Sequence, residues 1–313
     1  TLKFFQELGI FTTDRSGWIY PRSNQAQSVV DVLVMKARSL KVKLKTNQTV
    51  TGVSFADGQW KIHTDGWTYS GDAVILANGS RASSVAGSCE SGYEIAKSLG
   101  HHLIEPLPAL TALKCKGNSF SGWSGVRTEG TITLYIDGTP AVSQQGELQL
   151  TDYGVSGIPV FQISRYAIRA VHENKNVELS INFFPELNRK ELEEYLEHRK
   201  AACPYKTEKE LLIGLFPEKL IRVLCAQKDL IRRITDFRLP VKNGLSFEQA
   251  QVCSGGVDTS EVHSKTMESR LHKGLYFAGE LLDIDGTCGG YNLQWAWSSG
   301  AAAGIWAAKE EEK

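Results

Sequence analysis

The sequence predicts an α/β fold in which a discontinuous parallel-sheet domain carries an inserted antiparallel β part and a helical part. Two short apolar runs, Ala73–Ala77 and Leu275–Gly279, each lead into a small or polar turn, as buried strands of a parallel sheet do. Short alternating segments fill residues 106–183, and helical periodicity follows over residues 188–235. We therefore expect three parts, which are residues 1–108 with 255–313, residues 109–187 with 236–254, and residues 188–235.

Composition excludes several classes of protein. Among 313 residues, 35 Lys and Arg balance 35 Asp and Glu, so the chain lacks the basic excess that nucleic-acid binding or a polybasic membrane anchor needs. No apolar run reaches the roughly 18 residues of a membrane span. The six cysteines form no C-x-x-C pair, which argues against a disulfide framework or a metal site and favours a cytoplasmic protein.

The first forty residues predict helices. Residues 2–8 have the pattern of the last turns of a helix that ends at Gly9. Residues 23–40 repeat apolar side chains at helical spacing, and Ser23 or Asn24 is the expected N-cap. A short strand over Lys41–Leu44 is expected to follow.

Residues 49–77 predict a β meander that leads into the first buried strand. Asp57-Gly58 and Asp65-Gly66 separate alternating runs, which is a strong hairpin signal. The apolar run that follows ends in Asn78-Gly79-Ser80 and predicts a strand buried on both faces. A helix over about 91–99 is expected to stop at Gly100.

Later segments complete the prediction. Punctuated alternation over residues 106–183 is typical of an antiparallel barrel or sandwich. Residues 248–254 predict a strand, and residues 292–309 predict a helix rich in Ala and Gly. The clearest expected strands of the barrel or sandwich are Thr131–Ile136, Glu147–Thr151 and Val177–Phe183.

The segment Gly274–Gly304 carries the strongest chemical signal. A buried strand ends at Gly279 and is followed at once by Glu280. Gly289 and Gly290 then allow a backbone to approach a ligand closely, and a helix begins near Asn292. The N–H groups at such a helix start suit an anionic or carbonyl-rich ligand. An ordinary strand–turn–helix with a structural glycine loop is the alternative.

This segment resembles the C-terminal signature of FAD-dependent oxidoreductases with two dinucleotide-binding motifs, and more narrowly the BaiN-like, or aminoacetone oxidase, family. The resemblance extends over essentially the whole chain and implies a Rossmann-like FAD-binding domain. The other stretches that carry it are Gly87-Ser88, Gly92-Tyr93-Glu94, Gly146-Glu147-Leu148, Tyr153–Gly157, Val252–Gly256 and Thr266–Ser269.

The resemblance also implies which residues contact FAD. Glu280 would hold ribityl hydroxyls, Asp283 would lie near the ribityl chain or the pyrophosphate, and Val50 would offer backbone hydrogen bonds to the adenine. The turn Ala77-Asn78-Gly79-Ser80 corresponds to an Ala-Thr-Gly-Gly turn of the family, with Asn for Thr and Ser for Gly. The pyrimidine side of the flavin would be lined by Gly289, Gly290, Tyr291, Asn292 and Leu293, and Gly279, at the strand end before Glu280, would also bind the cofactor.

The chain departs from the family in one respect. The family begins with a strand, a G-x-G-x-x-G turn and a helix that cradle the pyrophosphate, and no G-x-G-x-x-G occurs in these 313 residues. We therefore expect the FAD-binding domain to be incomplete at its N-terminus, and this chain to bind FAD weakly or not at all.

The resemblance implies two-electron transfer through flavin N5, in amine oxidation or in NAD(P)H-linked reduction of an unsaturated small molecule. No residue marks itself as the acid, base or nucleophile. Cys288 is a weak candidate for a redox partner, and the alternative is a small apolar side chain that fills space. Arg22 is a weak candidate for binding a substrate anion, and the alternative is an ordinary surface cation. A flavin-binding or partner-binding protein without turnover is the second hypothesis.

Overall fold

The computed structural model describes residues 1–83, 85, 88–117, 120–226 and 228–309. Gly87 and residues 310–313 of the charged tail lie outside the described residues. The chain divides into two compact units, and each is described by itself. The three-part division expected from the sequence stays a prediction, because grouping residues by contact does not show which part folds alone. The first unit comprises residues 1–80, 89–105 and 255–313, and the second comprises residues 81–88 and 106–254.

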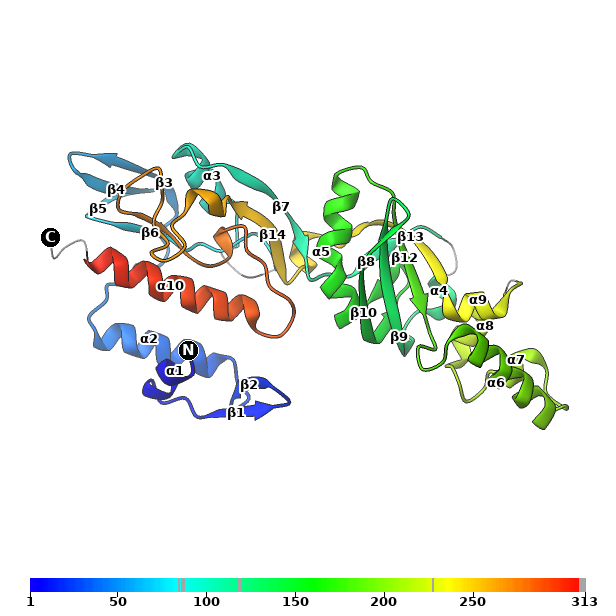
Figure 1. Ribbon diagram of the computed structural model, residues 1–313. Coiled ribbons are helices and arrows are strands. Elements are labelled where there is room, and N and C mark those ends of the chain that lie inside the picture. The colour runs from blue at the N-terminus through cyan, green and yellow to red at the C-terminus, as the bar shows by residue number, and fades with distance from the viewer. Residues whose placement is uncertain (84, 86–87, 118–119, 227, 310–313) are drawn as a thin grey trace. The chain divides into compact units, whose positions relative to one another are not determined.

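The first unit opens with a helix and a hairpin. Helix α1 (Leu2–Glu7) ends before Gly9, whose φ of 90° closes it as predicted. Strands β1 (Thr12–Arg15) and β2 (Trp18–Pro21) then pair antiparallel around Ser16-Gly17, both at positive φ. The sequence analysis missed this hairpin (Figure 1).

Helix α2 (Gln27–Ser39) begins later than expected, and the strand expected after it is absent. Asn24 has a φ of 55°, a left-handed conformation that cannot belong to the first turn of a helix. At the other end, Lys41 at φ 58° donates its N–H to Arg38 O, and Val42 donates to Ala37 O. These bonds close the helix C-terminus and use the backbone groups that a strand over Lys41–Leu44 would need.

The β meander is confirmed. Strands β3 (Val50–Ala56), β4 (Gln59–Thr64) and β5 (Thr68–Gly71) form an antiparallel sheet, and Asp57-Gly58 makes the first turn. Trp60 is fully buried beneath this sheet, and its Nε1–H donates to the carbonyl of Lys273 over 3.2 Å. The meander is thereby tied to the segment that precedes the last strand.

The parallel pair at the centre of the first unit consists of β6 (Val74–Leu76) and β15 (Leu275–Phe277), in register from Val74 opposite Leu275. Strand β15 is fully buried, whereas Ile75 of β6 is 38% exposed, so the expected burial of β6 on both faces is wrong at Ile75. Helix α10 (Tyr291–Lys309) packs against both strands, and helix α3 (Ser91–Ser98) packs against β3.

The second unit is built on a closed barrel of six strands, each paired antiparallel with its neighbours (Figure 1). The expected antiparallel barrel is therefore confirmed. Around the barrel the order is β10 (Thr139–Leu150), β11 (Gly154–Ser156), β8 (Leu113–Cys115), β13 (Phe237–Gly244), β12 (Val177–Asn182) and β9 (Arg127–Ile136).

A 15-residue helix within the region expected to be all strand was missed. Helix α5 (Ile158–His172) carries Val160, Ile163 and Ala167 on one buried face, and these side chains join the barrel core. Pro159 stands in its first turn, where the missing N–H costs nothing. The predicted helical part is confirmed as α6 (Arg189–Ala202), α7 (Glu208–Leu211), α8 (Glu218–Leu224) and α9 (Leu230–Thr235), and a short α4 (Phe120–Trp123) precedes β9.

Two strands each have residues in both units. Strands β7 (Leu103–Ala109) and β14 (Val252–Val257) form a two-stranded sheet. The strand expected at 248–254 therefore starts late, because a 3-10 turn over Phe247–Gln249 precedes it. Two further 3-10 turns cover Thr259–Glu261 and Gly279–Leu281. No helix among the described residues combines the length and apolarity required to span a bilayer.

Candidate functional site

Two of the predicted turns meet at one edge of the parallel pair. Asn78-Gly79-Ser80 follows β6, and Gly279-Glu280 follows β15. Because the strands are parallel, both turns leave at the same carboxyl edge, where ligands of α/β folds bind. Ser80 Oγ donates a hydrogen bond to Glu280 Oε1 over 2.7 Å. The structure thus brings together two segments that lie 200 residues apart.

Helix α10 holds the second of these turns. The N–H of Gly279 donates to Ser299 Oγ over 2.9 Å, and the indole N–H of Trp295 donates to the Gly279 carbonyl over 3.0 Å. Gly279 has a φ of 69°, which an L side chain rarely adopts. The turn after β15 is therefore fixed by α10, because the N–H and the carbonyl of Gly279 are both hydrogen-bonded to side chains of that helix.

Asn292 shapes the glycine loop that precedes α10. Its Oδ1 accepts from the N–H of Gly286 over 2.7 Å, and its Nδ2 donates to the Gly286 carbonyl over 3.1 Å. The side chain thus pairs with a backbone amide as a second amide would. Gly289 and Gly290 follow at φ values of 112° and 88°, and the loop depends on glycine at both positions.

The start of α10 is exposed. Tyr291 and Leu293 are 59% and 58% exposed, and Gly289 and Gly290 are also exposed. A Cβ built on Gly79 or Gly290 would stand in open space. The first-turn N–H groups of a helix have no intrahelical partner, so this surface offers hydrogen-bond donors and a partial positive charge.

Trp18 is a site residue that sequence reasoning missed. A Cβ built on Gly289 would overlap the six-membered ring of Trp18, so the indole lies directly on the glycine loop. The side chain is 41% exposed and therefore also faces solvent. The Ser16-Gly17 pair between alternating residues was a signal for the hairpin, but no local pattern predicts that its tip reaches residue 289.

The remaining predicted cofactor residues lie in supporting positions. Val50 opens β3 and packs against the buried core around Trp60. The N–H of Asp283 donates to Val257 O over 3.0 Å, and its side chain is half-buried. Ala77 is exposed at the end of β6. Contact of these residues, or of Gly279–Leu293, with a flavin stays a prediction.

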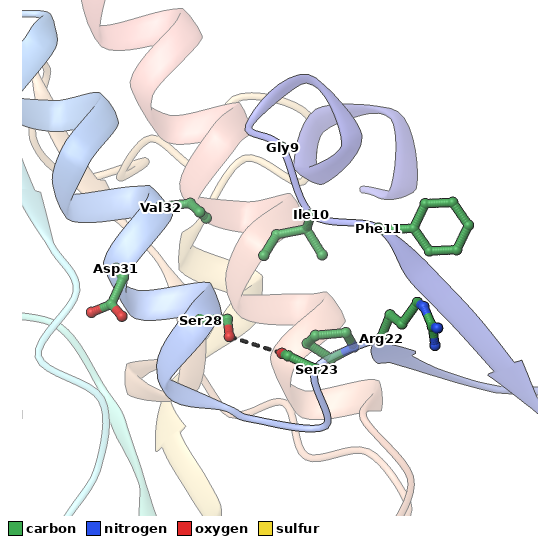
Figure 2. Close-up of a pocket in the computed structure, with 9 residues that line it drawn as sticks. Gly9, Ile10, Phe11, Arg22, Ser23, Ser28, Asp31 and Val32 are labelled. Atoms are coloured by element: carbon green, nitrogen blue, oxygen red, sulfur yellow. Dashed lines mark hydrogen bonds between the residues drawn. The ribbon is translucent and has the colours of Figure 1, made fainter.

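The two weak catalytic candidates occupy different surroundings. Cys288 is half-buried in the glycine loop, and burial raises the pKa of its thiol, which keeps it protonated and weakly nucleophilic at neutral pH. Arg22 is exposed and lines a hollow of about 400 Å³, in which Ser23 and Ser28 share a hydrogen bond of 2.9 Å. Figure 2 shows Arg22 and Asp31 on opposite sides of this hollow. Its other lining residues are Gly9, Ile10, Phe11, Pro21 and Val32.

Within the part of the chain that the structure describes, no three His, Cys, Asp or Glu side chains gather closely enough to hold a metal ion. The chemistry of the carboxyl edge is instead that of backbone N–H groups, one carboxylate and hydroxyls. Those groups bind hydroxyl-rich and carbonyl-rich ligands rather than cations.

Comparison with known proteins gives the same family. The chain is 43% identical, over an alignment of 326 residues, to a 3-dehydro-bile acid delta(4,6)-reductase of Clostridium scindens; the alignment covers 99% of this chain and 80% of that protein. It is 30% identical over 295 residues to a ribosomal RNA dihydrouridine synthase of Escherichia coli, with 88% and 70% covered. A protein of the same name from Haemophilus influenzae is 33% identical over 252 residues, with 74% and 59% covered.

The family model that matches is described as the HI0933-like protein Rossmann domain, and it covers residues 1–306. The expected Rossmann-type α/β fold and the resemblance drawn from the glycine-rich signature are both confirmed by this match. The chain belongs to the HI0933-like family of Rossmann-domain proteins, which are the BaiN-like FAD-dependent oxidoreductases.

Proposed function

We propose that this protein is an FAD-dependent reductase that saturates a carbon–carbon double bond conjugated to a carbonyl in a small, largely apolar molecule, with NAD(P)H as electron donor. The names of its relatives support this choice over amine oxidation. A delta(4,6)-reductase and a dihydrouridine synthase both add two hydrogens across such a double bond. The bile-acid reductase has the higher identity, which favours a polycyclic ketone as substrate.

The observation that carries the proposal is the Ser80–Glu280 hydrogen bond at the carboxyl edge of β6 and β15. A carboxylate held in this way is the kind of acceptor that the ribityl hydroxyls of FAD would need. The positive-φ Gly79 next to Ser80 leaves room, since a Cβ there would meet no atom within 4 Å, and the same holds at Gly290 before α10. These residues therefore fit FAD.

When bound, FAD would supply two-electron transfer through flavin N5. The residues of this chain would hold the flavin in position and polarise it. The first turn of α10, from Tyr291, would stabilise negative charge at the flavin pyrimidine by about 1 kcal/mol. Asn292 keeps the preceding loop in shape through Gly286. Trp18, lying on Gly289, would form an apolar wall on the same side.

Charge favours a small molecule over RNA. The chain has a formal net charge of zero, whereas neutralising phosphates requires a basic surface. The basic residues from Lys36 to Lys45 are all exposed around the end of α2, as on a solvated helix face. We therefore place RNA second among substrates, and binding of flavin without turnover second among functions.

The test is an anaerobic reduction assay. The purified protein is titrated with FAD, mixed with NADPH or NADH, and then given a steroid ketone whose conjugated double bonds absorb in the ultraviolet. We expect bleaching of the flavin by a nicotinamide donor, followed by loss of the substrate absorbance and recovery of the flavin spectrum. Glu280→Gln is the site variant, and unmodified ribosomal RNA is the competing substrate.

The outcomes separate the hypotheses. Turnover of the ketone that weakens in Glu280→Gln supports the proposal. Turnover of RNA without turnover of the ketone would identify RNA as the substrate. Bound FAD that no nicotinamide donor bleaches favours the binding role without turnover, and an FAD affinity that stays unchanged in Glu280→Gln contradicts the proposed site.

A further inference from the structure

A buried histidine lies behind β15, outside the candidate site. His101 follows helix α3, and only 3% of its surface is exposed. Its Nδ1 lies 2.9 Å from Glu261 Oε2, and its Nε2 lies 2.9 Å from Ser269 Oγ. The imidazole also packs edge-on against Phe277 of β15, with 4.7 Å between ring centroids. Three groups from residues 261–277 therefore meet on a side chain about 160 residues earlier in the sequence.

The hydrogen bonds determine where the protons of this group lie. Ser269 Oγ accepts from the N–H groups of Leu271 and His272, over 3.0 and 2.9 Å, which uses both of its lone pairs. Its own O–H must therefore be the donor to His101 Nε2. The imidazole is then neutral, with its proton on Nδ1 and donated to Glu261. The same carboxylate oxygen accepts the N–H of His102.

The segment around Ser269 supports the strand that leads to the candidate site. The N–H of Ser269 donates to Leu275 O over 2.7 Å, and Phe277 donates to Met267 O over 2.9 Å. These bonds place the segment along β15, whose last residue is two positions before Gly279. Met267 is held at a φ of 62°, a strained conformation for its side chain. The segment therefore depends on its tertiary contacts.

We propose that His101, Glu261 and Ser269 form a proton-sensitive latch that holds the 267–272 segment against β15. A proton taken from solvent onto His101 Nε2 places an N–H opposite the O–H of Ser269. Both lone pairs of that hydroxyl are already used, so Ser269 must give up one of its backbone donors to accept the new one. Protonation thus loosens the segment behind the strand that leads to Gly279 and Glu280.

The charges around His101 set the pH range of the latch. Burial, as the largest effect, lowers the pKa of His101 below its usual 6.5, and the neighbouring His272 lowers it further, while hydrogen bonding and attraction to Glu261 oppose the fall. Phe277 brings no charge from β15, and the exposed His102 pairs instead with Asp258. A pKa lowered on folding gives stability that is complete above 6.5 and is lost as the pH falls toward the folded-state value.

The experiment combines histidine NMR with variants. Selective 15N and 13C labelling of histidine reports the tautomer and the titration of His101 in the intact chain. His101→Phe keeps an aromatic ring against Phe277 and removes the titration, and Ser269→Ala removes the donor to Nε2. His102→Gln is the matched control, since it removes the adjacent exposed histidine. Thermal unfolding is followed from pH 7.5 to pH 5 for each protein.

We expect an Nδ1–H tautomer that titrates below 6.5 and moves to higher pH in Ser269→Ala. Because the pKa of His101 is lowered on folding, we expect Tm to fall as the pH drops below 6.5. That loss should disappear in His101→Phe and persist in His102→Gln, and amide protection at Phe277 should fall together with Tm in the parent protein. An Nε2–H tautomer, a pKa at or above 6.5, or an unchanged pH slope in His101→Phe would each overturn the latch. Should the variants fail to fold, the tautomer in the parent chain decides alone.

Discussion

The barrel of the second unit and the parallel pair of the first unit bury their strands to very different degrees. Ile132, Leu134 and Leu148 of the barrel have no exposed surface, and α5 packs against the barrel. In the first unit β15 is as fully buried, but its neighbour β6 exposes Ile75. Helix α10, which covers both strands, buries only Ser299 and Ala303 among its described residues.

This difference indicates that the barrel contributes mainly to stability, whereas the parallel pair carries the candidate binding surface. A closed barrel leaves no unpaired edge, so its core can be filled and its strands can be held by one another. The carboxyl edge of β6 and β15 has glycine turns and the half-buried carboxylate of Glu280, and the start of α10 exposes Gly289, Gly290 and Tyr291. Such groups contribute little to the core, and they are the groups that a bound ligand would complete.

Truncating the barrel core should cost the most. Leu134→Ala removes a fully buried side chain and should lower the free energy of unfolding by about 3 kcal/mol. Ile75→Ala is the matched change in β6 and should cost below about 1 kcal/mol, because Ile75 is partly solvated already. Urea unfolding followed by circular dichroism measures both. Equal losses would show that the exposed strand matters as much as the barrel.

Substitutions in the glycine loop should come next. Gly289→Ala and Gly290→Ala both place a side chain at positive φ, which should cost about 1–2 kcal/mol of stability. Only the alanine at 289 overlaps the Trp18 ring, so only that variant should push the indole into solvent. Acrylamide quenching of tryptophan fluorescence tests this. If both variants quench alike, the contact of Trp18 with Gly289 does not exist in solution.

The hydrogen bond at the carboxyl edge should have a smaller effect on stability than on binding. Ser80→Ala removes the donor to Glu280 and should cost about 1 kcal/mol of stability. Freed from Ser80, the carboxylate loses its fixed position, and FAD affinity should fall about fivefold, which is about 1 kcal/mol. Fluorescence titration with FAD measures this. Ser98→Ala is the control. The hydroxyl of Ser98 donates to the Ile95 carbonyl within α3, so its removal should leave FAD affinity unchanged.

The reactivity of cysteine thiols allows the two units to be compared in the protein without any substitution. Burial raises the pKa of Cys115 in β8 to about 12, so at pH 8 only about one molecule in 10⁴ carries its thiolate. Cys89 in the first unit is exposed. A thiol reagent at pH 8 should label Cys89 within minutes and Cys115 only after the barrel unfolds. Labelling of Cys115 in the folded protein would mean that the barrel opens readily.

The elements with strong local signals were predicted correctly. Asp57-Gly58 specifies a turn that few other residue pairs form, so the β3–β4 hairpin follows from the sequence. The apolar run at Leu275–Phe277, ending in glycine, likewise predicts a buried strand. The errors fall where a local signal was weak or misread. Helix α5 shows helical spacing at Val160, Ile163 and Ala167, but the strands around it drew the interpretation toward an all-β region.

The sequence by itself determined that this protein is built around a parallel strand pair and a glycine-rich helix start, because glycine placement and apolar runs are local properties of the chain. Only the tertiary structure decided what meets there. Ser80 reaches Glu280, and Trp18 lies on Gly289, because strand pairing and helix packing bring together residues that no periodicity connects. Such contacts depend on the shape of the whole unit, because the packing of distant segments, and not local sequence, decides which side chains become neighbours.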